Sequence, residues 1–168
     1  GKYLGFLNSL PIHAIKLGNQ NCTVVGTPVD SLIFIKVPYE INTVSNNLVL
    51  NLNGFILNGP SPFNLLPPYF SFSPAEGTFG TKISLTGRFN TIKSRNKVLF
   101  YKAIATVLSV GVNKMEVSVP TDVTVPAPNI IYQVSPFEIV SANQFKITPP
   151  VIKTFSPLSG PSGTKVTI

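Results

Sequence analysis

The only histidine and the only cysteine of the chain, His13 and Cys22, are the residues with the widest range of chemistry. A structural zinc site needs about four nitrogen or sulfur ligands, so one residue of each kind cannot form one with the usual spacing. A Cys–His pair can act as a nucleophile, but it needs a third group to orient the base, and the sequence offers none. We therefore expect structural roles for both residues, and no bound metal or other cofactor.

The six acidic residues are scattered singly along the chain; they are Asp30, Glu40, Glu76, Glu116, Asp122 and Glu138. No Asp-x-Asp run suggests a calcium loop. A glycosidase needs two carboxylates across a cleft, and nothing in the sequence pairs two of them. Glu40 and Asp122 each follow a Val-Pro pair at the same spacing, which indicates a repeated turn. We predict that the chain is not an enzyme.

Lysine and arginine number 13 against six acids, which gives the chain a net charge of +7. Such an excess can mark binding to nucleic acid or to an anionic surface. A possible basic contact loop holds Arg88, Lys93, Arg95 and Lys97, with Phe89 as the one aromatic residue able to stack on a base. Phosphate contacts from such a loop would be sensitive to salt and unspecific for sequence. We favour dispersed solubilising charge over a nucleic-acid site.

Sugar-binding surface modules usually present exposed aromatic rings, and the chain has no tryptophan. The candidates are four tyrosines, Tyr39, Tyr69, Tyr101 and Tyr132. We expect each of them to pack at a strand end or at a joint between domains, and we keep glycan binding as the alternative function. Asn21-Cys22-Thr23 matches the acceptor pattern for N-glycosylation, which has meaning only in a secreted eukaryotic segment.

A stretch at the end of the chain repeats one from its middle. Phe72-Ser73-Pro74 recurs as Phe155-Ser156-Pro157, and Gly80-Thr81-Lys82 recurs as Gly163-Thr164-Lys165, 83 residues apart in both cases. Proline closes a strand because it supplies no ladder donor, and the paired glycines permit turns with positive φ. This structural turn motif consists of Pro74, Gly77, Gly80, Pro157, Gly160 and Gly163. A fixed repeat spacing indicates repeated folding units.

These residues resemble the start of the IPT/TIG family of immunoglobulin-like domains, which occur in cell-surface receptors, microbial surface proteins, phage virion proteins and some transcription factors. Thr86-Gly87-Arg88-Phe89 completes the family pattern in the first copy, with one residue fewer between the glycine and the aromatic residue. The second copy stops at Ile168, before that glycine. The resemblance implies an all-β fold of tandem immunoglobulin-like (E-set) β-sandwiches. It implies little about function, because the family is a scaffold.

The repeat divides the chain into three parts. We expect a partial domain at 1–66 that lacks its first strands, a complete domain at 67–148, and the first strands of a further domain at 149–168. Residues 31–38 match 113–120 at a separation of 82 residues, and residues 1–3 align loosely with 87–89. We expect the chain to be a segment of a longer protein.

Alternation of apolar and polar residues in the middle part predicts strands at 69–73, 82–87, 97–101, 104–110, 115–119, 129–134 and 144–147. Earlier in the chain it predicts strands at 13–18, 23–25, 31–38 and 47–53. Two sheets would pack face to face over a core formed by Ile83, Leu85, Val98, Phe100, Val107, Val117, Val119, Ile131 and Val134. Pro67-Pro68 favours stiff, extended backbone, so the domains should stack as a semi-rigid rod.

We expect a non-enzymatic structural and interaction module on the outside of a cell or virus particle, in a cell-adhesion protein or a phage tail or fibre. Its partners would be neighbouring domains, further copies joined at sheet edges, or a surface receptor. A DNA-binding or dimerisation domain of a transcription factor is the weaker alternative. A lone cysteine forbids an internal disulfide, which favours a microbial or viral source. No apolar stretch approaches the roughly 20 residues of a membrane helix, so we expect no membrane insertion within this segment.

Overall fold

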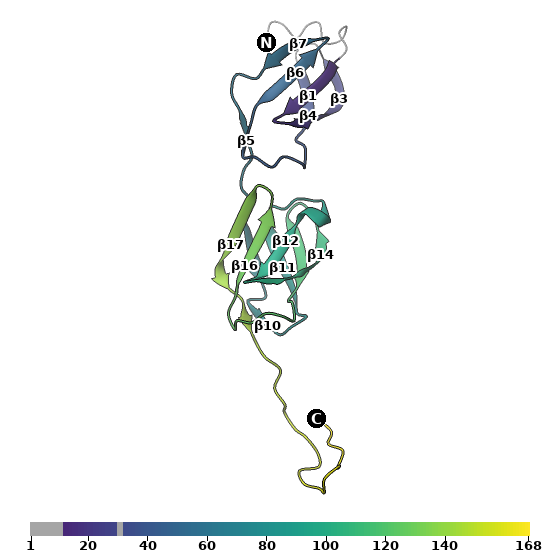
Figure 1. Cartoon of the computed structure of the whole chain (residues 1–168), viewed down its shortest axis with the longest axis vertical. Coiled ribbons are helices and arrows are strands. Elements are labelled where there is room, and N and C mark those ends of the chain that lie inside the picture. Colours follow the sequence, from purple (N-terminus) through teal and green to yellow (C-terminus); the bar gives the residue numbers. More distant parts are fainter. Residues whose placement is uncertain (1–11, 30–31) are drawn as a thin grey trace.

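The computed structural model describes residues 12–29 and 32–168. An N-terminal unit (β1–β8), a middle unit (β9–β18) and a C-terminal hairpin (150–168) follow one another along the long axis (Figure 1). The regular structure of these residues is β-strand apart from one short 3₁₀ turn, η1, at Lys93–Arg95. The fold is therefore all-β, as expected. In the part of the chain that the structure describes, no helix has the length and apolar character needed to cross a membrane.

The middle unit is an immunoglobulin-like sandwich of two four-stranded sheets. One sheet has the order β14 (Thr106–Val110), β15 (Lys114–Ser118), β11 (Lys82–Gly87), β9 (Phe70–Ser73). The other has the order β13 (Ala103–Ile104), β12 (Lys97–Phe100), β16 (Asn129–Val134), β17 (Phe137–Gln144). The short strands β10 (Glu76–Gly77) and β18 (Lys146–Ile147) pair in parallel and close one end of the sandwich.

The core of the middle unit lies between these sheets because side chains along each strand alternate between a buried and a solvent-facing side. Its buried members are Ile83, Leu85, Phe89, Val98, Phe100, Ala105, Met115, Val117, Val119, Ile130, Tyr132 and Phe145. Val107 and Val134 pack against it. Eight of the nine expected core residues are thus confirmed. Burying such side chains contributes roughly 1.5–3 kcal/mol each and is the main stabilising term.

Two expectations for the middle unit are wrong. Ile131 is only partly buried, since the neighbouring residues Ile130 and Tyr132 point into the core and the strand period of two turns Ile131 to the other face. The expected last strand at 144–147 is also displaced: the eight-residue strand β17 begins at Phe137 and pairs with β16 through a tight Ser135-Pro136 turn. That turn lacks the Asn-Gly or Asp-Gly signal by which a hairpin is usually found in a sequence.

The N-terminal unit has one four-stranded sheet with the order β2 (Gln20–Asn21), β1 (Ile12–Leu17), β6 (Leu48–Leu52), β7 (Phe55–Asn58). The hairpin of β3 (Thr23–Val29) and β4 (Leu32–Lys36) and the pair of β5 (Ser45–Asn46) and β8 (Phe63–Asn64) complete it. The four strands expected here correspond to β1, β3, β4 and β6, whereas β7 and β8 were not expected. Residues 1–3, Asp30 and the side chain of His13 lie outside the described residues.

Backbone hydrogen bonds recur between the N-terminal and middle units at the spacing of the sequence repeat. Cys22 N–H donates to Ile15 O at 2.7 Å, and Ala105 N–H, 83 residues on, donates to Val98 O at 2.9 Å. The sheet registers recur too, because Ile15 lies opposite Leu50 in the ladder and Val98 lies opposite Tyr132. The β1–β6 pair is therefore the structural counterpart of the β12–β16 pair.

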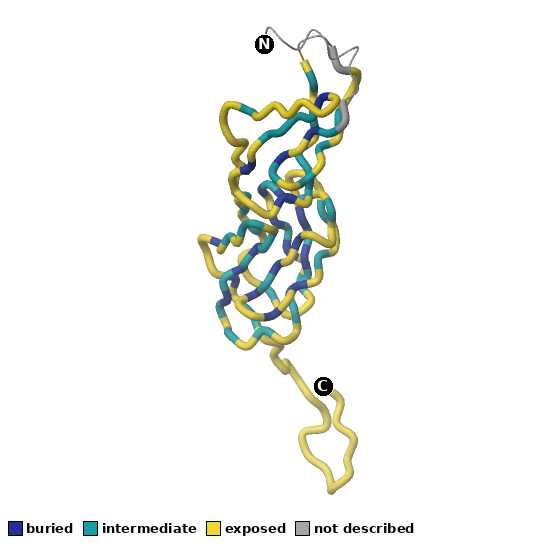
Figure 2. Tube along the Cα trace, turned by 45° about the horizontal axis from the view of Figure 1, so that its top comes forward, coloured by how far each residue is buried: buried dark blue, intermediate teal, exposed yellow. Residues whose placement is uncertain are grey.

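The C-terminal hairpin repeats the β9–β11 pair. Ser156 and Thr167 exchange both backbone hydrogen bonds, at 2.9 and 2.8 Å, and their counterparts 83 residues earlier, Ser73 and Ser84, lie opposite each other in the β9–β11 ladder. All residues of this hairpin are exposed, as the tube in Figure 2 shows. The hairpin therefore presents two strand segments of a sandwich without a second sheet.

Candidate functional site

The loop that follows β11 contains the predicted basic contact loop and is held by asparagine side chains. Asn96, which is buried, donates from Nδ2 to the backbone oxygens of Asn90 and Ile92, at 2.8 Å each. Asn90 in turn accepts a 2.9 Å bond from Ile92 N–H at its Oδ1 atom. Because these bonds close the loop onto itself, η1 has a defined position on the surface of the middle unit.

Tyr132 ties this loop to the core. Its hydroxyl donates a 2.6 Å hydrogen bond to Asn96 Oδ1 and accepts a 3.4 Å bond from Asn90 N–H. Phe70 and Phe89 lie edge-on to its ring, with centroid separations of 6.3 and 5.4 Å. Burial raises the pKa of Tyr132 to about 12, so the phenol is neutral and keeps its proton for Asn96 at physiological pH.

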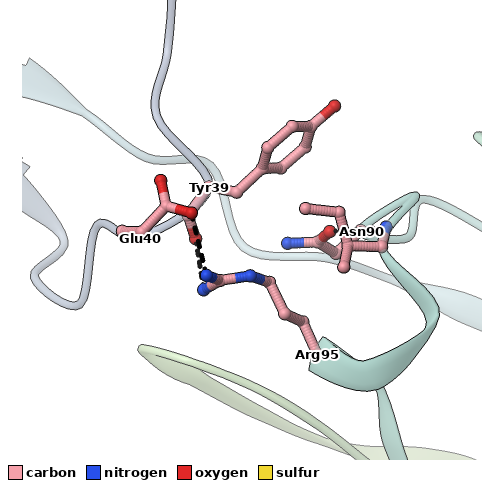
Figure 3. Close-up of polar contacts among 5 residues, drawn as sticks. Tyr39, Glu40, Asn90 and Arg95 are labelled. Atoms are coloured by element: carbon pink, nitrogen blue, oxygen red, sulfur yellow. Dashed lines mark hydrogen bonds and ion pairs between the residues drawn. The ribbon is translucent and has the colours of Figure 1, made fainter. Parts of the chain in front are cut away.

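The loop meets the N-terminal unit through Arg95 (Figure 3). Arg95 Nη2 forms an ion pair with Glu40 Oε1 at 2.9 Å, and Arg95 Nη1 donates to Tyr39 O at 3.1 Å. The Tyr39 hydroxyl shares a 3.1 Å hydrogen bond with Thr91 Oγ1. The bond to Thr91 and the nearby ammonium of Lys36 lower the pKa of Tyr39. Three polar contacts therefore connect the turn at Tyr39–Glu40 with the loop of the middle unit.

Arg88 holds the segment that links the two units. Its guanidinium donates to the backbone oxygen of Pro67 and lies 5.5 Å from the ring centroid of Tyr69. Its backbone N–H donates to Tyr69 O at 3.0 Å. Proline restricts the backbone of this segment, and Arg88 adds side-chain and main-chain anchors, so the link is held from both sides.

An apolar pocket of about 270 Å³ lies beside these contacts. Pro38, Ile41 and Leu65 line it from the N-terminal unit, and Phe89, Val134 and Phe137 line it from the middle unit. The joint between the units therefore combines apolar surface with the polar contacts of Arg88 and Arg95. We use the term joint for these pocket residues together with Tyr39, Glu40, Pro67, Arg88, Thr91 and Arg95.

The four residues of the predicted basic contact loop do not converge on one patch. Arg88 and Arg95 are part of the joint, and Lys93 Nζ donates to Leu108 O at 3.2 Å. Lys97 lies exposed on β12, opposite Gln133 in the ladder. Three of the four cations thus bind groups of the chain itself, which lowers their value as phosphate contacts.

The glycines of the turn motif differ in what they require. Gly80 and Gly163 have positive φ, at 78° and 92°, a conformation that other residues rarely adopt. Gly77 and Gly160 have ordinary φ, but a side chain at either would meet the side chain of Thr81 or Thr164. Pro74 and Pro157 each follow a cis peptide bond. The two copies of the motif have the same local geometry.

Among the tyrosines considered for sugar binding, Tyr132 is excluded because it is fully buried. Tyr39 is half-buried in the joint, whereas Tyr69 and Tyr101 are exposed. Exposed apolar side chains also gather on β7, namely Phe55, Ile56 and Leu57. In the described residues no three His, Cys, Asp or Glu side chains lie close enough together to hold a metal ion. Burial raises the pKa of the Cys22 thiol, which disfavours the reactive thiolate.

The sequence analysis missed Asn90 and Asn96, and assigned Glu40 to a turn alone. Glu40 does lie in a turn, but its carboxylate also pairs with Arg95, 55 residues away. No local pattern in the sequence marks a contact of that kind. The asparagines had a weak signal, because Asn favours turns in which its side chain bonds nearby backbone.

No protein-family model matches the sequence, and no curated protein does. The fold is similar to the plexin A4 extracellular region, with a TM-score of 0.53 and 14% identity over 87% of this chain and 13% of that one. A Bacteroides thetaiotaomicron protein of unknown function has 27% identity and a TM-score of 0.47, over 49% of this chain and 22% of that one. An auxiliary nutrient binding protein from Bacteroides thetaiotaomicron has 21% identity and a TM-score of 0.46, over 49% and 21%. The chain spans less than a quarter of each of these three structures, and the plexin A4 likeness shows the fold.

Proposed function

We propose that the chain is a non-enzymatic structural and interaction module of an extracellular or particle-surface protein. Its parts at 1–66, 67–148 and 149–168 would be one partial, one complete and one further partial domain of the IPT/TIG type. Stacked end to end, they hold a binding region at a distance from the surface and offer sheet edges and loops to neighbours. A cell-adhesion protein and a phage tail or fibre are the two settings that this geometry suits.

The joint is the observation that supports the proposal most. A spacer must resist bending, and a bare flexible link would not provide that. Here the link is short and proline-rich, and Arg88 and Arg95 bind backbone and carboxylate groups across it. The surfaces of the two units also meet at an apolar pocket. The basic loop therefore supports the stacking of the units, which disfavours its use in nucleic-acid binding.

Small-angle X-ray scattering of the full chain tests the spacer role. We expect one extended shape with a narrow range of sizes for the wild type, and a broader range for a variant with both Arg88→Ala and Arg95→Ala. Lys97→Ala is the matched control, since it removes an exposed cation outside the joint. A wild type as flexible as the double variant would contradict the proposal.

Glycan binding is the second candidate, because Tyr69 and Tyr101 expose 64% and 45% of their surfaces. A glycan array probed with the wild type and with Tyr69→Ala and Tyr101→Ala variants tests it. Binding that one of these variants loses would favour this function, and no binding by the wild type would remove it. Binding to duplex DNA that falls steeply with salt and requires Lys93, Arg95 and Lys97 would instead favour the nucleic-acid alternative.

A further inference from the structure

Apolar side chains of the C-terminal hairpin lack a packing partner among the described residues. Val166 and Ile168 are 50% and 79% exposed. Their counterparts 83 residues earlier, Ile83 and Leu85, are both 0% exposed and lie in the core of the middle unit. Residues of the type that fill a core therefore stand in water, and exposed apolar surface of this kind marks a contact site.

The N-terminal unit has the complementary gap. Among the described residues β4 pairs only with β3, whereas its counterpart β15 lies between β14 and β11. The β3–β4 and β14–β15 hairpins are in equivalent registers, with Thr23 opposite Lys36 in one and Thr106 opposite Ser118 in the other. An edge strand with unpaired backbone groups is a template for strand addition. The free side of β4 is thus the position that β11 occupies in the middle unit.

An aromatic contact of the middle unit is divided between the same two surfaces. Phe72 packs on Phe145 with ring centroids 6.4 Å apart. The counterpart of Phe72 is Phe155 in the hairpin, 50% exposed, and the counterpart of Phe145 is Phe63 on β8, 44% exposed. The residue two positions after each of Phe63 and Phe145 donates an equivalent backbone bond, from Leu65 to Val44 and from Ile147 to Pro126, both at 2.8 Å. The hairpin therefore carries what the N-terminal unit lacks.

The two surfaces lie at opposite ends of the molecule (Figure 1), so they cannot meet within one chain. We propose that the C-terminal hairpin of one copy adds to the free edge of β4 in a second copy and completes its N-terminal unit. This contact joins two different surfaces and leaves one of each free, so it propagates head to tail. The proposal goes beyond the spacer function and does not depend on the stiffness of the joint.

The β11–β15 ladder supplies the register of this contact. Ile83 lies opposite Val117 and Leu85 lies opposite Met115, so Val166 of one copy should lie opposite Ile35 of the other, and Ile168 opposite Ile33. The same register brings Lys165 opposite Lys36, where the middle unit has Lys82 opposite Ser118. Like charges directly opposite each other in a ladder are destabilising. The association should therefore be weak at low salt and respond to charge reversal.

Sedimentation velocity across the micromolar to millimolar range tests the proposal on the full chain. We expect association that Val166→Ser or Phe63→Ser weakens at least about tenfold, because each removes a buried apolar contact. Leu158→Ser is the matched control: Leu158 is 81% exposed, and its counterpart in the middle unit, Ala75, is also exposed. It should leave the association unchanged. Val166 and Leu158 lie in the exposed hairpin, so these two changes spare the cores of both units.

Charge reversal tests the register. Lys165→Glu and Lys36→Glu should each strengthen the association, because each places opposite charges in the Lys165–Lys36 pair. The variant with both changes restores a like-charged pair and should lose that gain. A gain in both single variants that persists in the double variant would come from reduced net charge and would overturn the register.

Disulfide trapping in a Cys22→Ser background distinguishes the head-to-tail contact from other association. Thr167 and Phe34 are the counterparts of Ser84 and Glu116, which lie opposite each other in the ladder. Chains with Thr167→Cys should cross-link to chains with Phe34→Cys and not among themselves. A wild type that stays monomeric, as it would if residues 1–11 of the same chain occupied the edge of β4, overturns the proposal. So does association that the Val166 and Phe63 variants leave unchanged.

Discussion

The hydroxyl of Tyr132 donates a 2.6 Å hydrogen bond to Oδ1 of Asn96, 36 residues earlier in the chain. Tyr132 belongs to the core of the middle unit, and Asn96 closes the loop that carries Arg95 to the N-terminal unit. This bond therefore connects the packing of a sandwich to the geometry of the joint beside it. A change in the core at this position should reach the contact between the units.

Replacing Tyr132 by Phe should lower the free energy of unfolding of the middle unit by about 1–3 kcal/mol, because the buried Asn96 Oδ1 atom would lose its donor. Urea unfolding followed by circular dichroism measures the change. Tyr101→Phe is the control, since the Tyr101 side chain is 45% exposed, and it should stay within about 0.5 kcal/mol of the wild type. Equal stabilities for the two variants would show that the Asn96 bond is dispensable.

Tyr132 also predicts a loss of stability at alkaline pH. Its folded pKa is raised to about 12, above the ordinary value of about 10. The native state therefore holds this proton more tightly than the unfolded state. The resulting stability is fully present below pH about 10 and is lost as the pH rises through about 12, with a limit of about 2–3 kcal/mol. Unfolding measured from neutral pH upward should fall more steeply for the wild type than for Tyr132→Phe. Parallel curves would contradict this origin.

The Arg95–Glu40 ion pair should affect the geometry of the joint more than its stability. The two side chains are 37% and 50% exposed, so a double-mutant cycle with Arg95→Ala and Glu40→Ala should give a coupling of about 0–1 kcal/mol that salt screens. Spin labels on the two units should nevertheless show a broader distance distribution in Arg95→Ala. A coupling well above this range would mean that the pair is more shielded from water than its exposure indicates.

Gly87→Ala should destabilise the middle unit by about 1–3 kcal/mol through overpacking. A Cβ atom at Gly87 would overlap the backbone oxygen of Tyr69 and lie 2.8 Å from Phe70 Cα, both on the neighbouring segment. Gly111→Ala is the matched control, because its nearest neighbour would be the backbone oxygen of Lys114 at 3.7 Å. Thermal unfolding compares the two variants. Equal midpoints would show that β9 can move away from β11 without loss.

Much of the fold could be predicted because its signals are local or repeated. The 83-residue repeat locates the β9–β11 turn and its C-terminal copy, and alternation locates most strands. Ile131 was assigned to the wrong face because Ile130, Ile131 and Tyr132 are all apolar or aromatic and do not reveal the phase of the strand. The Arg95–Glu40 pair and the Tyr132–Asn96 bond depend on how folded segments meet. No spacing in the sequence encodes such contacts, so the joint could be found only in the structure.

The central claim is that the joint holds the N-terminal and middle units in one orientation. Backbone residual dipolar couplings test it most directly, measured on the full chain with Val166→Ser to keep it monomeric. We predict that couplings from both units fit one alignment tensor with the same magnitude and axes. Tensors that differ in magnitude between the two units would show that they reorient independently and would contradict the account.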